Sequence, residues 1–300
     1  MYVISVIGVV CIFGLVGNGA VIYLLGFCMK RTPFTIYILN LAVADSGVLV
    51  ATIFEVVLHI VKMHLLDSLL YFHVVSRSLF RFAYSTSQFL LTAISIDRCV
   101  SVLFPLWYQC RRPEKLSSVL CALIWLLSFP VHATCFAFEI TSRPETFPSV
   151  FYAFLVNAVV CLPLIVVSTL ILSVRFCFKS QQRQRGKLLT AILLTLFFFL
   201  FLAFPFNIVF LFFSNPLSSH EYRLNVKCYN LTEYGLLCAS LNSFVNPLLY
   251  FLIGRMKKGL CRENLKLILQ RVFIEKEEDC REEQKPSNEI CGSPLSQETF

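Results

Sequence analysis

Long apolar stretches alternate with short polar ones along most of this 300-residue chain. The apolar stretches cover residues 2–28, 35–60, 69–103, 116–138, 147–177, 188–214 and 231–253. Each is long enough to cross the hydrocarbon core of a bilayer, which takes about 20 residues of helix. None resembles the roughly ten-residue alternating strands of a membrane barrel. The pattern therefore predicts an all-α membrane protein, a bundle of seven transmembrane helices within residues 1–253.

Composition agrees with a membrane protein. Hydrophobic residues make up 57% of the chain and charged residues 15%, and the mean hydropathy is +0.73, which nearly excludes a soluble domain. Much of the formal net charge of +8 lies in the connections after the first, third and fifth spans. Because cytoplasmic loops are rich in lysine and arginine, we expect the amino terminus outside and the tail inside. These basic residues would then meet anionic membrane lipid and cytosolic partners, not nucleic acid.

Asp45 lies within the second apolar stretch, where a carboxylate without a partner would be costly. Amides and hydroxyls occur at a comparable depth in three other stretches. We expect these groups to satisfy Asp45 inside the bundle: Asn18, Ser87, Asn242, Ser243 and Asn246.

Polar residues also follow one face of the third span. Arg77, Arg81, Tyr84 and Gln88 are spaced at i, i+4, i+7 and i+11, so they share one side of a helix. Lipid is a poor environment for such a face, which we expect to line the bundle interior or an outward-opening cavity.

Two interpretations of the arginines on this face remain open. They could be structural cations paired with Glu55, Glu139 or Glu145. Alternatively, they could anchor the carboxylate, sulfate or phosphate of a ligand, because a guanidinium presents a fixed fork of donors.

Smaller signals concern bends and covalent modification. Asn230 begins an Asn-x-Thr sequon on the predicted outer side and is a candidate for glycosylation. Cys135 and Cys228 lie near the outer surface, where a disulfide and two separate packing thiols both remain open. Prolines predict local bends in the fourth to seventh spans: Pro130, Pro163, Pro205 and Pro247.

The segment after the last span divides into two parts. Residues 254–273 mix basic and apolar positions at spacings that predict a short amphipathic eighth helix on the inner leaflet. Cys261 within it is a candidate for palmitoylation, with a plain buried thiol as the alternative. Residues 274–300 combine an acidic run with scattered serines, and we expect a disordered cytoplasmic tail.

Six motifs in order resemble the rhodopsin-like G protein-coupled receptors, over residues 8 to about 273. They are GNGAVIYLL, LAVAD, Asp97-Arg98-Cys99 after the third span, Trp125, Pro205, and the NPLLY segment that ends at Tyr250. Within that group, FTIYILNLAVAD, LLTAISIDRC and SVLFPLWYQCRRPEKLSSVLCALIWLLS resemble the Mas-related receptors. The resemblance implies a multi-pass protein of the plasma membrane that binds an extracellular ligand and activates a heterotrimeric G protein.

Several positions depart from the wider family. His73 stands where most members keep a cysteine, and Ala203 replaces the usual tryptophan of the sixth span. Phe80 occupies the place of the aspartate in amine receptors, so a cationic amine ligand would have no counter-ion there. Cys135 and Phe151 replace the acidic pair of relatives that take basic peptides.

The ligand expected from the resemblance is a peptide or a small molecule, and an anionic or amphipathic one is favoured. A related receptor for a small amino acid uses an arginine high on its third span, close to the position of the arginines here. The candidate ligand-contact residues are Arg77, Arg81, Phe80, Tyr84, Glu55 and Asn207.

The resemblance also implies an ion site and a switch. Asp45, Ser87, Asn242, Ser243 and Asn246 would surround an allosteric sodium ion, with an ion-free hydrogen-bond network as the alternative. On activation the bundle would rearrange around prolines such as Pro205 and Pro247, Arg98 of the Asp97-Arg98 pair would contact the carboxyl terminus of a G protein α subunit, and Tyr250 would swing inward. Arg111 and Arg112 would line the contact. Receptor kinases and arrestin would act on the tail.

Other classes of protein fit less well. An ion or solute transporter or channel would also explain a buried carboxylate and broken helices, but no inverted repeat is visible. Five scattered histidines offer no catalytic triad or metal-binding pattern, so an enzyme is not expected. A modulatory receptor that binds without coupling keeps the same fold, although the intact Asp97-Arg98 pair argues against it.

Overall fold

The computed structural model describes residues 2–29, 31–62, 70–141, 155–178, 190, 192–202, 207 and 226–255. In this part of the chain the regular elements are helices. Their order is α1 (Tyr2–Tyr23), η1 (Leu24–Cys28), α2 (Pro33–Lys62), α3 (Leu70–Leu103), α4 (Pro105–Cys110), α5 (Leu116–Thr141), η2 (Asn157–Cys161), α7 (Leu162–Phe178) and α9 (Val226–Arg255). A further short apolar helix covers Ile192–Leu202.

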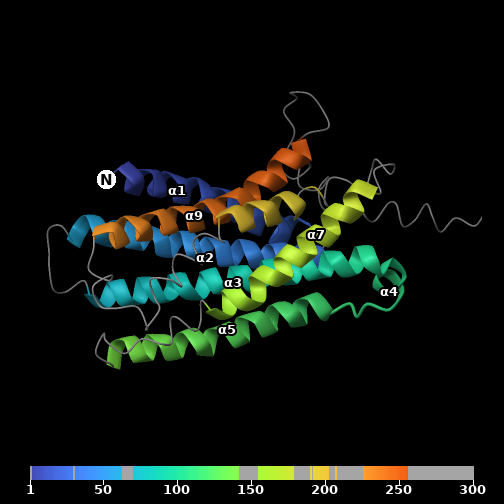
Figure 1. Ribbon diagram of the computed structural model, residues 1–300, viewed down its shortest axis with the longest axis horizontal. Coiled ribbons are helices and arrows are strands. Elements are labelled where there is room, and N and C mark those ends of the chain that lie inside the picture. The colour runs from blue at the N-terminus through green and yellow to red at the C-terminus, as the bar shows by residue number, and fades with distance from the viewer. Residues whose placement is uncertain are drawn as a thin grey trace, which may run out of the picture.

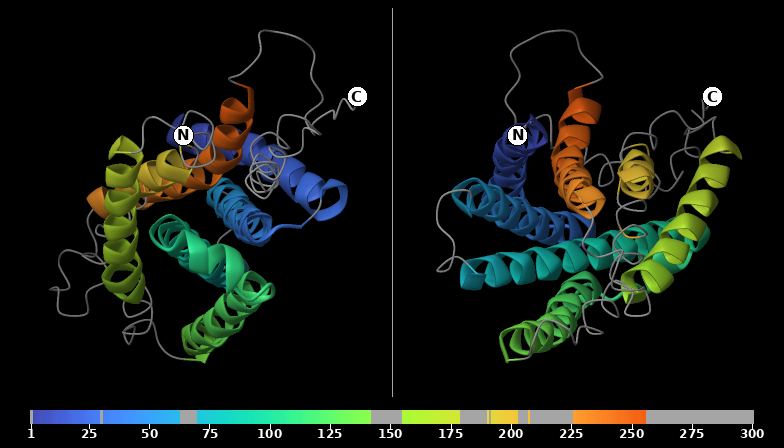
Figure 2. Two further views of the ribbon diagram at one scale, coloured as in Figure 1. Left: turned by 90° about the vertical axis from the view of Figure 1, so that its right-hand side faces the viewer. Right: turned by 60° about the vertical axis from the view of Figure 1, so that its left-hand side comes forward.

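The long helices pack side by side around α3 (Figure 1). α3 lies between α2 and α5, as both views of Figure 2 also show, and α7 crosses it in the view of Figure 1. α1 packs on the far side of α2 and against α9. This arrangement puts the helix with the most polar sequence in the middle of the bundle, where its side chains meet partners from several neighbours.

Five described helices are long and apolar enough to cross a membrane: Tyr2–Cys28, Pro33–Val61, Leu116–Thr141, Asn157–Arg175 and Glu233–Leu252. α3 spans 34 residues, but its many polar side chains lower its hydropathy and it is not among these five. Outward side chains of the apolar helices are themselves hydrophobic; Phe13 of α1 is 63% exposed and Leu126 of α5 is 68% exposed. Such a surface is suited to lipid, because a soluble protein rarely exposes extended apolar faces.

Glycines allow α1 to approach its two neighbours closely. A Cβ atom on Gly14 would lie 2.8 Å from Leu49 Cδ1 of α2, and one on Gly17 would lie 3.0 Å from Pro247 Cγ of α9. Small residues are typical of such contacts in membranes, since the backbones can then meet without a hydrophobic driving force.

Three of the four prolines predicted to bend the spans lie within described helices. Pro130 lies inside α5 and Pro247 inside α9. Pro163 follows η2, a turn of π-helix, which is a recognised cause of bending. Pro205 lies outside the described residues.

The short helix α4 was not expected from the hydrophobic pattern. It begins with Pro105 at its first turn, where a proline loses nothing because that backbone donor has no helical partner. The eighth helix, Cys261 and the tail lie outside the described residues, so the boundaries 254–273 and 274–300 stay predictions.

Candidate functional site

The middle of the bundle holds Asp45, a fully buried carboxylate of α2. Ser87 of α3 donates to Oδ1 at 2.8 Å, and Ser243 of α9 donates to the same oxygen at 3.0 Å. Asn246 of α9 donates through Nδ2 to Oδ2 at 2.7 Å. The expected contacts from these three side chains are confirmed, and they tie together three helices that are distant in sequence.

Two other expected partners lie elsewhere. Asn18 of α1 donates to the backbone carbonyls of Gly14 at 2.9 Å and Ser243 at 3.0 Å, so it ties α1 to α9 without reaching the carboxylate. Asn242 is buried, but the described hydrogen bonds of Asp45 do not include its amide. Predicting donors to Asp45 from their depth alone was therefore wrong for both, because depth does not specify which way a side chain points around its helix.

The chemistry around Asp45 suits a small hard cation. One carboxylate, two hydroxyl oxygens and the amide oxygens nearby are the ligands that such ions prefer. Among the described residues there is no group of three or more His, Cys, Asp or Glu side chains that would hold a transition metal.

Closer to the predicted outer end of α3, Arg81 pairs with an acidic residue of the protein itself. Its guanidinium forms an ion pair with Glu139 of α5, and the side chains are 8% and 16% exposed. Ser78 joins them, accepting from Arg81 at 2.9 Å and donating to Glu139 at 3.2 Å. Of the two interpretations left open for Arg81, the structure favours the internal ion pair. Glu145 lies outside the described residues.

The described hydrogen bonds of the Arg81–Glu139 pair do not include Glu55 or Arg77, although Arg77 lies within electrostatic reach of both glutamates. Glu55 of α2 lies with Oε2 at 3.2 Å from His73 Nδ1, so this histidine joins α2 to α3. Arg77 is exposed, unlike Arg81, Tyr84 and Gln88. The three inner members of the expected polar face are therefore buried in the bundle, and the placement of Arg77 in an outward-opening cavity stays a prediction. A step of four residues turns a helix by about 40° beyond a full turn, and near its end the long arginine stem can reach outward.

One turn deeper, Tyr84, Gln88 and Asn207 form a buried polar group. Asn207 donates to the Tyr84 hydroxyl at 3.4 Å and accepts from Gln88 Nε2 at 3.4 Å. The ring of Phe80 stacks on that of Tyr84, with centroids 5.6 Å apart and planes 8° apart. Three of the candidate ligand-contact residues, Phe80, Tyr84 and Asn207, therefore lie together with Gln88 near the Arg81 ion pair.

Two buried polar residues of this region were missed by the sequence reasoning. His132 of α5 is hydrogen-bonded through Nδ1 to the carbonyl of Ser128 at 2.9 Å. Asn157 of η2 donates to Ser85 of α3 at 2.8 Å. The signal available in the sequence was a histidine and an asparagine within apolar stretches, since such residues rarely face lipid.

At the opposite end of α3, Asp97 is surrounded by two arginines and a tyrosine. Arg98 Nη2 donates to Oδ2 at 2.5 Å, and Arg112 Nη2 donates to Oδ1 at 2.6 Å. Tyr108 of α4 donates its hydroxyl to Oδ2 at 3.0 Å. Arg112 also reaches Ser117 of α5 at 2.6 Å. The network joins α3, α4 and α5 at one point.

Two features stabilise this network further. The Arg98 guanidinium lies 4.3 Å from the centroid of the Phe34 ring of α2, within the range of a cation–π contact. Burial raises the pKa of Tyr108 to about 12, so its hydroxyl remains a donor at physiological pH.

Arg111 and Arg112 differ sharply, although both were expected to line a cytoplasmic contact. Arg111 is exposed, whereas the Arg112 side chain is only 5% exposed because it is held by Asp97. For Arg112 the expectation of a guanidinium open to a partner is wrong in this arrangement.

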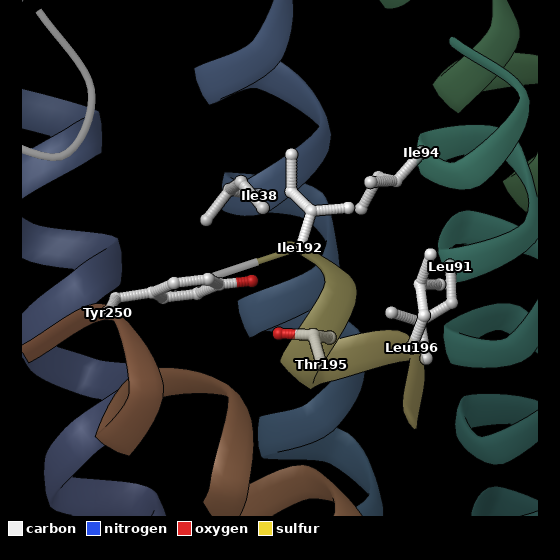
Figure 3. Close-up of a pocket in the computed structure, with 7 residues that line it drawn as sticks. All are labelled: Ile38, Leu91, Ile94, Ile192, Thr195, Leu196 and Tyr250. Atoms are coloured by element: carbon white, nitrogen blue, oxygen red, sulfur yellow. The ribbon is translucent and has the colours of Figure 1, made fainter. Parts of the chain in front are cut away.

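Tyr250 of α9 is buried and borders a small cavity (Figure 3). The other walls include Ile38 of α2, Leu91 of α3 and Thr195 of the Ile192–Leu202 helix. The hydroxyls of Tyr250 and Thr195 point toward one another across it (Figure 3).

The predicted modification sites are only partly described. Cys135 is a buried free thiol, and the side chain of Cys228 lies outside the described part. Asn230 lies in the first turns of α9 by its backbone, but its side chain is not among those described.

Residues 17–250 match the family described as 7 transmembrane receptor (rhodopsin family). The Mas-related G-protein coupled receptor member H of Rattus norvegicus is 38% identical over 277 residues, 91% of this chain and 84% of that protein. The Proto-oncogene Mas of Rattus norvegicus is 35% identical over 277 residues, covering 90% and 83%. Member D of Macaca fascicularis is 36% identical over 275 residues, covering 89% and 83%. The chain therefore belongs to the rhodopsin family of seven-transmembrane receptors and, within it, to the Mas-related G protein-coupled receptors.

Proposed function

We propose that this receptor lies in the plasma membrane with its amino terminus outside, binds an extracellular ligand and activates a heterotrimeric G protein. The observation that carries the proposal is the closed network around Asp97. Arg98 is held there by a carboxylate, a tyrosine hydroxyl and a ring face. A cation held by several separate noncovalent contacts can exchange them for another partner when the helices shift.

A ligand changes this equilibrium only through its different affinity for the two arrangements. The coupling path proposed here runs along α3, which carries Arg81 near one end and Arg98 near the other. Movement around Pro247, and around Pro205, would open the cytoplasmic side. Arg98 would then contact the G protein, with Tyr250 turning inward and Arg111 contributing from the exposed side of the loop.

The internal pair of Arg81 with Glu139 refines the proposed ligand. Because the pair is neutral overall, a simple anion would have to displace Glu139 before it could bind Arg81. A peptide or an amphipathic molecule can contact the pair, the Phe80–Tyr84 stack and Asn207 together. Arg77, which is exposed, lies one turn nearer the predicted outer end of α3, and the partly buried Glu55 contacts His73 of the same helix.

The resting receptor is proposed to hold a sodium ion at Asp45. Ser87 and Ser243 would turn their hydroxyl lone pairs to the ion, and Asn246 would keep the second carboxylate oxygen in place. Asn242 would have to rotate to join them. The ion would supply positive charge to a buried carboxylate and so favour the resting arrangement.

The direct test is nucleotide exchange on purified G proteins, with a panel of acidic amino acids, peptides and sterol-like amphiphiles. Stimulated GTP binding by at least one compound is expected. Arg98→Ala should reduce that exchange to the background rate and leave binding of the active compound unchanged. Normal exchange by Arg98→Ala would refute the assigned role.

The same protein in a planar bilayer tests the second candidate function. Ion pathways also contain a buried carboxylate such as Asp45 within a bundle of proline-bent helices. Steady conductance without any added compound, together with no exchange on any G protein, would favour the transporter or channel. Binding of a compound without exchange would favour a modulatory receptor.

Arrestin and receptor kinases are proposed to act on the activated receptor through the serines and threonines of residues 274–300. Loss of arrestin recruitment on truncation after residue 273, with exchange preserved, is the expected result.

A further inference from the structure

Asp97 is shared by two guanidiniums that use different oxygens. Arg98 lies 2.5 Å from Oδ2, and Arg112 lies 2.6 Å from Oδ1. The side chains are 4%, 5% and 7% exposed for Arg98, Arg112 and Asp97. Because neither arginine occupies the place of the other, Arg98 can leave the carboxylate without displacing Arg112.

Arg112 is also anchored to elements other than α3. Its Nη1 donates to the Tyr108 hydroxyl of α4 at 2.5 Å, and its Nη2 donates to Ser117 of α5 at 2.6 Å. The guanidinium lies 4.4 Å from the centroid of the Tyr108 ring. These contacts keep Arg112 beside Asp97 even when Arg98 takes another partner.

We infer that Arg112 is a positioning residue that holds the charge of Asp97 when Arg98 departs. This inference rests on the proposed coupling to a G protein. In the resting arrangement the carboxylate has two guanidinium partners, and in the active one it has only Arg112. A buried carboxylate left without a cation is strongly destabilised. Arg112 therefore lowers the free energy of the active arrangement more than that of the resting one.

Two other roles are consistent with the same contacts and predict different results. As a latch of the resting state, Arg112 would oppose activation, so its loss would increase exchange. As a purely structural link between α4 and α5, Arg112 would stabilise both arrangements equally, whether or not Arg98 contacts Asp97.

The first experiment measures nucleotide exchange by the purified full chain with G protein heterotrimers and no added ligand. Arg112→Gln should lower exchange about tenfold, the factor that about 1.4 kcal/mol produces. Lys115→Gln is the matched control, because it removes one positive charge from an exposed position of the same loop and should leave exchange unchanged. In an Asp97→Asn background, Arg112→Gln should have no further effect. Equal or increased exchange by Arg112→Gln would overturn the inference.

The second experiment needs no G protein. The midpoint of thermal unfolding is compared for Arg112→Gln with Arg98 present and in an Arg98→Ala background. The decrease should be about twice as large without Arg98, since Arg112 is then the only guanidinium on Asp97. Equal decreases in the unfolding midpoint would show that Arg112 is only a structural link and would overturn the inference. Absence of exchange by the unaltered chain, both without ligand and with every compound of the panel, would refute the proposed coupling instead, so the two failures are distinguishable.

Discussion

Asp45 and Asp97 are two buried aspartates on neighbouring helices, and the protein satisfies them in opposite ways. Among the described residues, the hydrogen-bond donors to Asp45 are two hydroxyls and one amide, all of them neutral. Asp97 instead lies between two guanidiniums. The first carboxylate has contacts but no counter-charge, and the second has more counter-charge than it needs.

The difference indicates what each site can respond to. A carboxylate that has only neutral donors can gain a mobile cation or a proton, and either would change its interactions with α3 and α9. Asp97 has little need of an external ion, because its partners belong to the protein. Its site can change only when the helices move and an arginine leaves. We therefore propose ion sensitivity for the middle of the bundle and partner exchange for the end of α3 that carries Asp97.

The largest expected effect is on stability, when each aspartate is replaced separately by asparagine. Asp97→Asn leaves two buried guanidiniums without a counter-charge and should lower the free energy of unfolding by about 3–5 kcal/mol. After Asp45→Asn the amide oxygen can still accept some of the hydrogen bonds from the neutral donors. The free energy of unfolding should therefore fall by only about 1–3 kcal/mol. Thermal unfolding of the purified receptor measures both, because 1 kcal/mol moves the midpoint by about 2–4 °C in proteins of comparable size. A larger decrease for Asp45→Asn would reverse the comparison.

A smaller effect should separate the two sites by their response to sodium. Sodium at about ten times its dissociation constant would stabilise the resting receptor by about 1.4 kcal/mol. The unfolding midpoint should rise in sodium chloride relative to a large organic cation chloride, and Asp45→Asn should abolish the rise. Asp97→Asn is the matched control, because it removes the other buried carboxylate and should keep the rise. Persistence of the sodium effect in Asp45→Asn would exclude Asp45 as the site.

The smallest effect concerns Tyr108, the neutral donor within the charged network. Tyr108→Phe removes hydrogen bonds to Asp97 and to both arginines and should cost about 1 kcal/mol. Burial raises its pKa to about 12, so its contribution is fully present below the ordinary tyrosine value of about 10 and is lost only as pH rises through the higher value. The difference in unfolding midpoint between the two proteins should therefore be the same at about pH 6 and about pH 9. A difference that shrinks within that interval would show that the hydroxyl ionises there.

Much of the fold could be predicted from the hydrophobic pattern. α1, α2, α3 and α5 were expected nearly at their observed bounds, because a long apolar run in lipid has to satisfy its backbone within one helix. The depth of Asp45 and the polar character of α3 are also local properties of the sequence. A short amphipathic connection such as α4 lacks that signal, since six residues show no clear period.

The sequence by itself thus determined which helices exist and which polar groups had to be buried. Only the tertiary structure decided how those groups pair. In the folded bundle Asn18 donates to backbone carbonyls and Glu139 pairs with Arg81. Arg112 turns inward and pairs with Asp97, whereas Arg111 remains exposed. The physical reason is that pairing depends on the rotation of each helix and on neighbours many residues away, whereas burial in a membrane depends mainly on the apolar residues immediately around a position.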